Sequence, residues 1–189
     1  MRVISGSAKG IKLASVPGKS TRPITDQVKE ALFNIIGPDV AGKFFLDLFG
    51  GTGAVGIEAL SRGAEHVVFL DTNYQAYKVI QKNLESTNLS DFATVLKKDA
   101  FVFLREKPTQ IFEFIYIAPP QYKSIWEKAM QLLDENPGWS AAGEVVIVQI
   151  HPKEFVEDKT YANFRIFDRR SYGDTLLVFY EHISPETDS

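Results

Sequence analysis

Short apolar runs alternate with stretches of helical periodicity through the middle of the chain. The apolar runs have the length of buried strands, and the stretches between them place apolar residues three and four positions apart, as one face of a helix does. Strands that alternate with helices in this way are typical of a parallel sheet covered by helices on both faces. We therefore expect strands in residues 43–49, 66–71, 93–99, 112–118 and 144–150, and helices in residues 54–63, 74–87, 100–107 and 124–136.

Both ends of the chain depart from this alternation. Residues 164–173 and 174–182 are β-rich runs with no helix between them, which predicts an antiparallel hairpin. Residues 1–15 predict a second, small β-hairpin, and residues 25–37 predict an amphipathic helix. We expect a single domain over residues 1–189, with an N-terminal hairpin and helix (1–38), an α/β core (43–183) and a tail (184–189).

The composition is that of an ordinary globular protein. The 189 residues are 44% hydrophobic and 24% charged, with a net charge of −3. The absence of cysteine excludes disulfides, thiolate zinc sites and thiol nucleophiles. No N-terminal apolar segment resembles a secretory signal, and no run reaches the roughly eighteen apolar residues of a membrane span. We therefore expect a cytoplasmic protein with no membrane partner.

Positive charge is concentrated at the N-terminal end. Residues 1–29 carry six basic side chains against the single acid Asp26, whereas the rest of the chain is acidic overall. A polyanion such as RNA would therefore be met by this end, through attraction to its phosphates. On charge alone, a solvated basic surface explains the pattern better. The six basic residues are Arg2, Lys9, Lys12, Lys19, Arg22 and Lys29.

The stretch DLFGGTGAVG, residues 47–56, contains the glycine spacing G-x-G-x-x-G between a predicted strand and a predicted helix. With Asp71 twenty residues after Gly51, it matches the pattern that binds NAD. Asp47 argues against NAD, because a carboxylate at the end of the first strand would repel a pyrophosphate. The same carboxylate favours S-adenosylmethionine, which carries a sulfonium and an ammonium group and no phosphate.

Two further aspartates, Asp71 and Asp99, end the next two predicted strands. A carboxylate at Asp71 can accept hydrogen bonds from both hydroxyls of a ribose, and Asp99 can reach the amino group of an adenine. The alternative is that strand-end aspartates cap the following helices, and for Asp99 alone that alternative is favoured. Acids at the ends of three consecutive strands together favour a nucleoside cofactor.

The fourth predicted strand ends in FIYIAPPQY. Pro119 and Pro120 fix the backbone at the carboxyl end of the strand, which is where an open α/β sheet binds its ligand. The alternative is a simple strand terminator. The glycine-rich loop upstream favours a functional role.

Four stretches together resemble the RsmD family of bacterial methyltransferases, which modify guanine N2 in small-subunit (16S) ribosomal RNA. They are MRVISGSAKGIKL, TRPITDQVKEALFNIIG, LDLFGGTGAVGIEALSRGA and SYGDTLLVFY. The resemblance implies a Rossmann-like, seven-stranded, mostly parallel sheet and an RNA substrate, either free or in an assembling small subunit. It also implies a cofactor site formed by Arg22, Pro23, Thr25, Asp26, Asp47, Phe49, Gly51, Gly53, Asp71 and Asp99.

The chain departs from this family at the end of the fourth strand. The family, like other amino-group methyltransferases, has Asp or Asn, two prolines and an aromatic residue there. This chain has Ala118, Pro119, Pro120 and Gln121, with Tyr122 one position late. An exocyclic amine is a poor nucleophile that needs acceptors for its hydrogens, and losing one acceptor costs roughly 3 kcal/mol, about a hundredfold in rate. A slower enzyme, a substitute acceptor and a silent cofactor-binding protein all stay open.

Other chemistries have little support in the sequence. His66, His151 and His182 show no metal-ligand spacing, and we expect no metal. Neither a nucleophile elbow nor a P-loop motif is present. We expect a methyltransferase that uses S-adenosylmethionine and holds RNA phosphates with Arg2, Lys9, Lys12 and Arg22. The alternatives are an NAD-dependent oxidoreductase and a catalytically silent RNA-binding protein.

Overall fold

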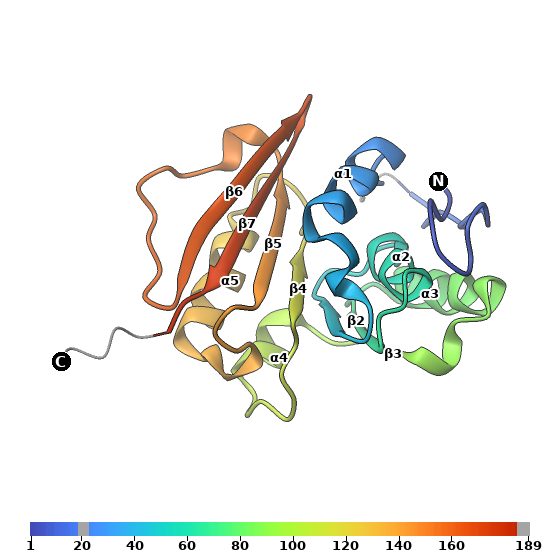
Figure 1. Cartoon of the computed structure of the whole chain (residues 1–189), viewed down its shortest axis with the longest axis horizontal. Coiled ribbons are helices and arrows are strands. Elements are labelled where there is room, and N and C mark those ends of the chain that lie inside the picture. The colour runs from blue at the N-terminus through green and yellow to red at the C-terminus, as the bar shows by residue number, and fades with distance from the viewer. Residues whose placement is uncertain (19–22, 185–189) are drawn as a thin grey trace.

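A computed structural model describes residues 1–18 and 23–184. Seven strands form one sheet in the order β3-β2-β1-β4-β5-β7-β6 (Figure 1). The order reverses between β1 and β4, which is the position where open α/β sheets bind ligands. The strands are β1 (Phe44–Asp47), β2 (His66–Leu70), β3 (Ala93–Leu96), β4 (Phe114–Ile117), β5 (Val145–Ile150), β6 (Phe164–Tyr172) and β7 (Thr175–His182).

The pairing confirms the predicted architecture. Strands β1 to β5 pair in parallel, β7 is antiparallel to β5, and β6 and β7 form the C-terminal hairpin. The register places Asp47, the last residue of β1, between Phe69 of β2 and Tyr116 of β4. The carboxyl ends of the parallel strands therefore meet at one edge of the sheet.

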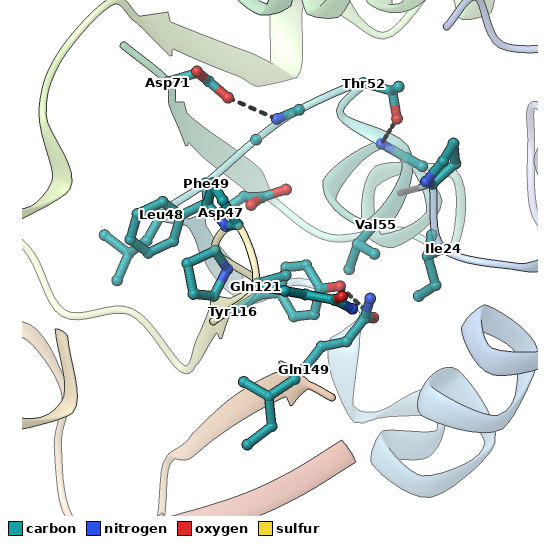
Figure 2. A pocket seen from close by; sticks show the side chains of 18 of the residues that line it. Ile24, Asp47, Leu48, Phe49, Thr52, Val55, Asp71, Tyr116, Gln121 and Gln149 are labelled. Carbon is teal, nitrogen blue, oxygen red and sulfur yellow. Dashed lines mark hydrogen bonds between the residues drawn. The ribbon is translucent and has the colours of Figure 1, made fainter. Parts of the chain in front are cut away.

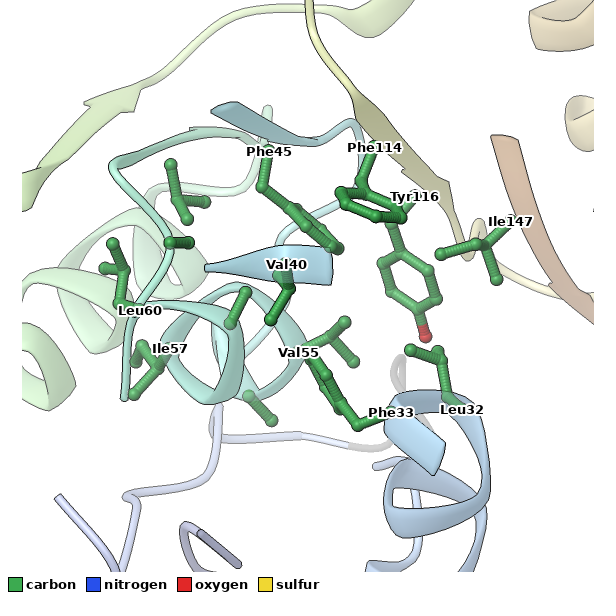
Figure 3. Packing of buried hydrophobic residues seen from close by; sticks show 14 of the residues in the cluster. Leu32, Phe33, Val40, Phe45, Val55, Ile57, Leu60, Phe114, Tyr116 and Ile147 are labelled. Atoms are coloured by element: carbon green, nitrogen blue, oxygen red, sulfur yellow. The ribbon is translucent and has the colours of Figure 1, made fainter. Parts of the chain in front are cut away.

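Helices cover both faces of the sheet. Side chains of α1, α2 and α3 pack on one face, against residues such as Phe45 and Tyr116 (Figure 3). Side chains of α4 and α5 pack on the other face, against residues such as Leu46 and Ile115. The helices are α1 (Asp26–Ile36), α2 (Ala54–Ser61), α3 (Tyr74–Thr87), α4 (Ala100–Arg105) and α5 (Ile125–Glu135), with short 3-10 turns at Gly37–Val40, Ser90–Phe92, Pro137–Trp139 and Pro152–Glu154.

Polar side chains fix where three of the helices begin. Thr25 accepts a hydrogen bond from the N–H of Val28 and so starts α1. Asn73 and Asp99 cap α3 and α4 in the same way, each accepting backbone N–H bonds in the first turn. Because α3 and α4 start where β2 and β3 have just ended, their first turns face the carboxyl edge of the sheet, and the start of α1 reaches the same edge from the N-terminal side.

The N-terminal segment is less regular than the predicted hairpin. It contains one antiparallel bridge, between Arg2 and Lys12, and no extended strand. The N–H groups of Ile4 and Ser5 donate to the carboxylate of Glu58 in α2, at 2.8 and 3.0 Å. A partner strand would compete for these two N–H donors, so hydrogen bonds to α2 take the place of further strand-to-strand hydrogen bonds in this segment.

Lys29 does not belong to the basic surface predicted at the N-terminal end. Its side chain is fully buried and forms an ion pair with Glu58, which is also fully buried. Lys19 and Arg22 lie outside the described residues. Within the described ranges, no helix is long and apolar enough to cross a bilayer.

Candidate functional site

A cavity of about 1100 Å³ opens at the carboxyl edge of the parallel strands. Its walls come from the segments that follow β1, β2, β3 and β4, from the end of β5, from the start of α1 and from the turn between β6 and β7 (Figure 2). Small-molecule sites measure roughly 300 to 1,000 Å³, so the space is sufficient for a nucleoside cofactor and part of a second ligand.

The glycine-rich loop forms one wall of the cavity. Gly51 adopts a positive φ of 57°, and its N–H donates to Oδ2 of Asp71 at 3.0 Å. The other oxygen of Asp71 accepts the N–H of Asn73 at 2.8 Å. Asp71 therefore fixes the loop after β1 while it lines the cavity, and each carboxylate oxygen keeps a second lone pair for a ligand.

The other two glycines of the motif serve the turn and the packing behind the loop. Gly53 has a φ of 79° at the N-cap of α2 and is not among the lining residues. A Cβ on Gly56 would lie 2.3 Å from Cε1 of Phe69, so this glycine lets α2 approach β2 closely. Only Gly51 of the three contributes to the cavity wall, together with Phe49, whose ring contacts Phe101 edge-on.

Asp47 is buried at the base of the cavity. Its Oδ1 has no hydrogen-bond partner in the protein. Burial, reinforced by the neighbouring charge of Asp71, raises the pKa of Asp47 to about 7, and the backbone N–H groups of Phe49 and Gly56 oppose that rise. The sequence alone predicts a fixed negative charge at Asp47. In the structure the pKa of this carboxyl lies near neutral pH and its Oδ1 is an unused acceptor, which suits a ligand that brings its own positive charge.

The residues after β4 divide into two groups. Ala118, Pro119, Pro120 and Gln121 line the cavity. Tyr122 is not among the lining residues: it has a φ of 63°, its side chain is 64% exposed, and its N–H donates to Glu154. This backbone conformation turns Tyr122 toward His151, whose ring centroid lies 5.5 Å from that of Tyr122.

Of the residues predicted at the N-terminal side of the site, some line the cavity and others do not. Pro23 and Thr25 line the cavity, whereas Asp26 is absent from the lining and forms an ion pair with Arg2 at 3.4 Å. Arg22 lies outside the described residues. Lys9 and Lys12 are exposed on the N-terminal segment.

Asp99 caps α4, and it also lines the cavity. The turn Tyr172–Thr175, where the sequence alone favoured a plain hairpin turn, also contributes to the wall. Within residues 1–18 and 23–184, no group of three or more His, Cys, Asp or Glu side chains is arranged to hold a metal ion.

Tyr116 and Gln149 are among the lining residues that the sequence analysis did not single out. Tyr116 in β4 donates a hydrogen bond from its hydroxyl to Oε1 of Gln149 in β5, at 2.7 Å (Figure 2). A polar residue in the otherwise apolar run VVIVQI was the signal that pointed to Gln149, because a buried strand tolerates such a residue only with a partner or a ligand.

The model of a family described as conserved hypothetical protein 95 matches residues 1–181. The chain belongs to this family. The predicted resemblance to the RsmD family is confirmed by this match together with the relatives that follow.

Two curated relatives are named Ribosomal RNA small subunit methyltransferase D. The one from Haemophilus influenzae is 34% identical over 187 residues, covering 96% of this chain and 94% of its own length. The one from Escherichia coli K12 is 33% identical over 149 residues, covering 79% and 74%.

Solved structures share the fold. The Escherichia coli protein yhhF superposes with a TM-score of 0.85 at 29% identity, covering 97% of this chain and 98% of its own. An RNA methyltransferase from Salinibacter ruber in complex with S-adenosyl-L-homocysteine has a TM-score of 0.67 at 14% identity, covering 89% and 98%. At that identity the second likeness shows the Rossmann-like fold alone.

Proposed function

We propose that this chain transfers a methyl group from S-adenosylmethionine to the exocyclic N2 of a guanine in small-subunit (16S) ribosomal RNA. The coarser part, an rRNA methyltransferase, is supported by membership of the family and by relatives named for that activity. The choice of guanine N2 is supported by the resemblance of the sequence motifs to the RsmD family. A ribosomal RNA substrate implies a cytoplasmic location.

One observation carries the choice of cofactor. The buried Oδ1 of Asp47 lacks a partner and lies where the glycine-rich loop meets β4. The ammonium group of a methionine moiety would supply that partner and, by its charge, would favour the ionised carboxylate. A pyrophosphate in this position would meet a carboxylate instead, so the geometry supports S-adenosylmethionine over NAD.

The remaining lining residues fit the rest of this cofactor. Gly51 offers a backbone without a side chain beside the methionine end, and Asp71 has lone pairs for the ribose hydroxyls. Asp99 accepts the N–H of Phe101, whose ring contacts that of Phe49, and this acceptor beside two aromatic rings suits a flat adenine. When bound, S-adenosylmethionine supplies an electrophilic methyl group and a neutral thioether as leaving group.

The protein would act on the target base by position and by hydrogen bonding. The N2 lone pair attacks the methyl carbon in line with the carbon–sulfur bond, the sulfur keeps the electron pair of that bond, and the amine then loses a proton to water. Pro119 lines the cavity, and its backbone carbonyl would be the acceptor for an amine hydrogen as positive charge develops. No covalent enzyme intermediate is needed, so positioning supplies most of the rate.

The test is a comparison of small-subunit RNA from cells with and without this protein, by mass mapping of nucleosides. We expect one N2-methylguanine to be missing without the protein and to return when purified protein and labelled S-adenosylmethionine are added. Calorimetric titration of S-adenosylmethionine and NADH separates the two cofactors. Cofactor binding without transfer of label would identify a silent homologue instead.

A further inference from the structure

Gln149 is the one polar residue in β5, whose other five residues are Val or Ile. It is half buried, and its side chain reaches the cavity that also contains Asp47 and Ala118. An amide group in an apolar strand costs free energy unless its hydrogen bonds are made. One of them is made by Tyr116, and within residues 1–18 and 23–184 no group accepts a hydrogen bond from the amide nitrogen.

The register places Gln149 beside the position where this chain lacks a side-chain acceptor. Ile117 of β4 pairs with Val148 of β5, so the next residues along, Ala118 and Gln149, are neighbours on the two parallel strands. Both residues line the cavity. Since Ala118 ends at Cβ, the space next to it is open to the longer side chain on the adjacent strand.

Tyr116 holds this amide in one orientation. The tyrosine is buried, and its hydroxyl donates to Oε1 of Gln149 at 2.7 Å, as the dashed line in Figure 2 shows. Burial and the nearby Asp47 raise the pKa of Tyr116 well above its usual value, so the hydroxyl keeps its proton at working pH. With Oε1 facing Tyr116, the Nε2 of Gln149 is directed away from that hydroxyl.

An amide fixed in this way matches one edge of guanine. That edge presents the N2 amino group, a donor, next to the ring nitrogen N3, an acceptor. A carboxamide presents an acceptor next to a donor, and its oxygen has a second lone pair when one is taken by Tyr116. A base taken out of its helix is read through such edge contacts.

We propose that Gln149 binds the target guanine by its N2 and N3 edge, with Oε1 accepting an N2 hydrogen and Nε2 donating to N3, and that Tyr116 is its positioning residue. This inference rests on the proposed function, because it takes guanine N2 as the methylated group. Gln149 then supplies from β5 the side-chain acceptor that position 118 lacks. The same two contacts select for a purine that presents an amino group beside N3.

The experiment replaces one atom of the base and one side chain of the protein. The probes are two uridine-rich RNA oligonucleotides, one with a single guanosine and one with 3-deazaguanosine at the same place, in which N3 becomes C–H. Binding is measured by fluorescence anisotropy with S-adenosylhomocysteine at saturation, so that no turnover is required. We expect the wild-type protein to bind the 3-deaza probe about three- to tenfold more weakly, as the loss of one hydrogen bond predicts.

The variants assign that difference to a residue. Gln149→Met keeps the length of the side chain and removes the amide, so the two probes should bind equally well. Gln131→Met is the matched control, since it removes an exposed amide of α5 that is not part of the cavity lining and should keep the discrimination. Tyr116→Phe should reduce the discrimination between the probes. Adding Ala118→Asn to Gln149→Met should partly restore that discrimination. Unchanged affinity for S-adenosylhomocysteine shows that each variant is folded.

The proposal is overturned if wild type binds both probes equally or binds neither, or if Gln149→Met still discriminates between them. The proposed function has a separate readout, the methylation of small-subunit RNA. Discrimination that depends on Gln149 in a protein without transferase activity would support this inference and contradict the proposed function. Transfer to guanine N2 by a protein that does not discriminate between the two probes would support the proposed function and contradict this inference.

Discussion

Lys29 and Glu58 form an ion pair at 3.3 Å in which neither side chain is exposed to solvent. Glu58 also accepts the N–H groups of Ile4 and Ser5, and the ammonium of Lys29 donates to the carbonyl of Arg2. One buried pair therefore joins α1, α2 and the N-terminal segment. Since α1 begins at the cavity wall, the pair also sets the position of one side of the site.

Removing one partner of this pair should destabilise the protein strongly. Lys29→Met leaves the carboxylate of Glu58 buried without the charge of Lys29. Losing one partner of a buried ion pair lowers the free energy of unfolding by about 3 to 5 kcal/mol. Urea denaturation measures the change, and proteolysis of residues 1–13 reports release of the segment. Glu181→Gln is the control, because it breaks an exposed pair with Arg165 that is worth less than about 1 kcal/mol. Similar losses of unfolding free energy in the two variants would show that burial of the Lys29–Glu58 pair does not increase its contribution to stability.

Affinity for S-adenosylmethionine should increase with pH through the pKa of Asp47, which is about 7. The cationic ligand favours the ionised carboxylate, whose fraction increases about tenfold between pH 6 and pH 8. Calorimetry at the two pH values should therefore show affinity increasing by up to about tenfold in the wild type, and a weaker, pH-independent affinity in Asp47→Asn. Adenosine lacks the charged end and should bind equally at both pH values. A flat profile for the wild type would remove Asp47 from the cofactor site.

The same residue should lower the stability of the ligand-free protein as pH rises. An unfolded aspartate loses its proton near pH 4, whereas the folded carboxyl keeps it until about pH 7. Between these values the folded state binds the extra proton, so the contribution of Asp47 to stability decreases as pH increases and is constant above pH 7. We expect Asp47→Asn to be more stable than wild type at pH 8, by about 2 to 4 kcal/mol, and to show a smaller difference at pH 5. Equal pH dependence of the unfolding free energy in both proteins would contradict the assignment.

Gly56→Ala should destabilise the contact between α2 and β2. The added Cβ would lie 2.3 Å from Cε1 of Phe69, in a helix and a strand that are both buried. Overpacking of this kind costs about 1 to 3 kcal/mol, measured by urea denaturation. Gly138→Ala is a milder comparison, since its Cβ would approach only Cγ of Pro108, at 3.2 Å. Equal losses would mean that α2 can shift to make room.

Reversing the charges of Lys9 and Lys12 should weaken RNA binding and spare the cofactor. Both side chains are exposed on the N-terminal segment, away from the lining of the cavity. Loss of two phosphate contacts should lower the slope of log affinity against log salt by about 2. Filter binding to small-subunit RNA at several salt concentrations measures this slope, and calorimetry checks the cofactor. An unchanged slope would show that RNA is held elsewhere.

The sequence by itself determined the elements of the α/β core and their order. Local periodicity predicted α3 at residues 74–87 and placed Thr25 ahead of α1, and the structure has both. It also placed Asp47, Asp71 and Asp99 at the same edge, because the ends of successive parallel strands must lie together. These inferences depend on spacing along the chain, which the sequence contains.

Only the tertiary structure decided the chemical state and the partners of the side chains. Lys29 counts as a surface charge in the sequence, and its burial becomes visible only when α1 packs on α2. The pKa of Asp47 is raised to about 7 because neighbouring elements exclude water from it. Tyr116 and Gln149 are 33 residues apart and meet only through strand register. Burial and pairing are properties of contacts between distant segments, so no local pattern could specify them.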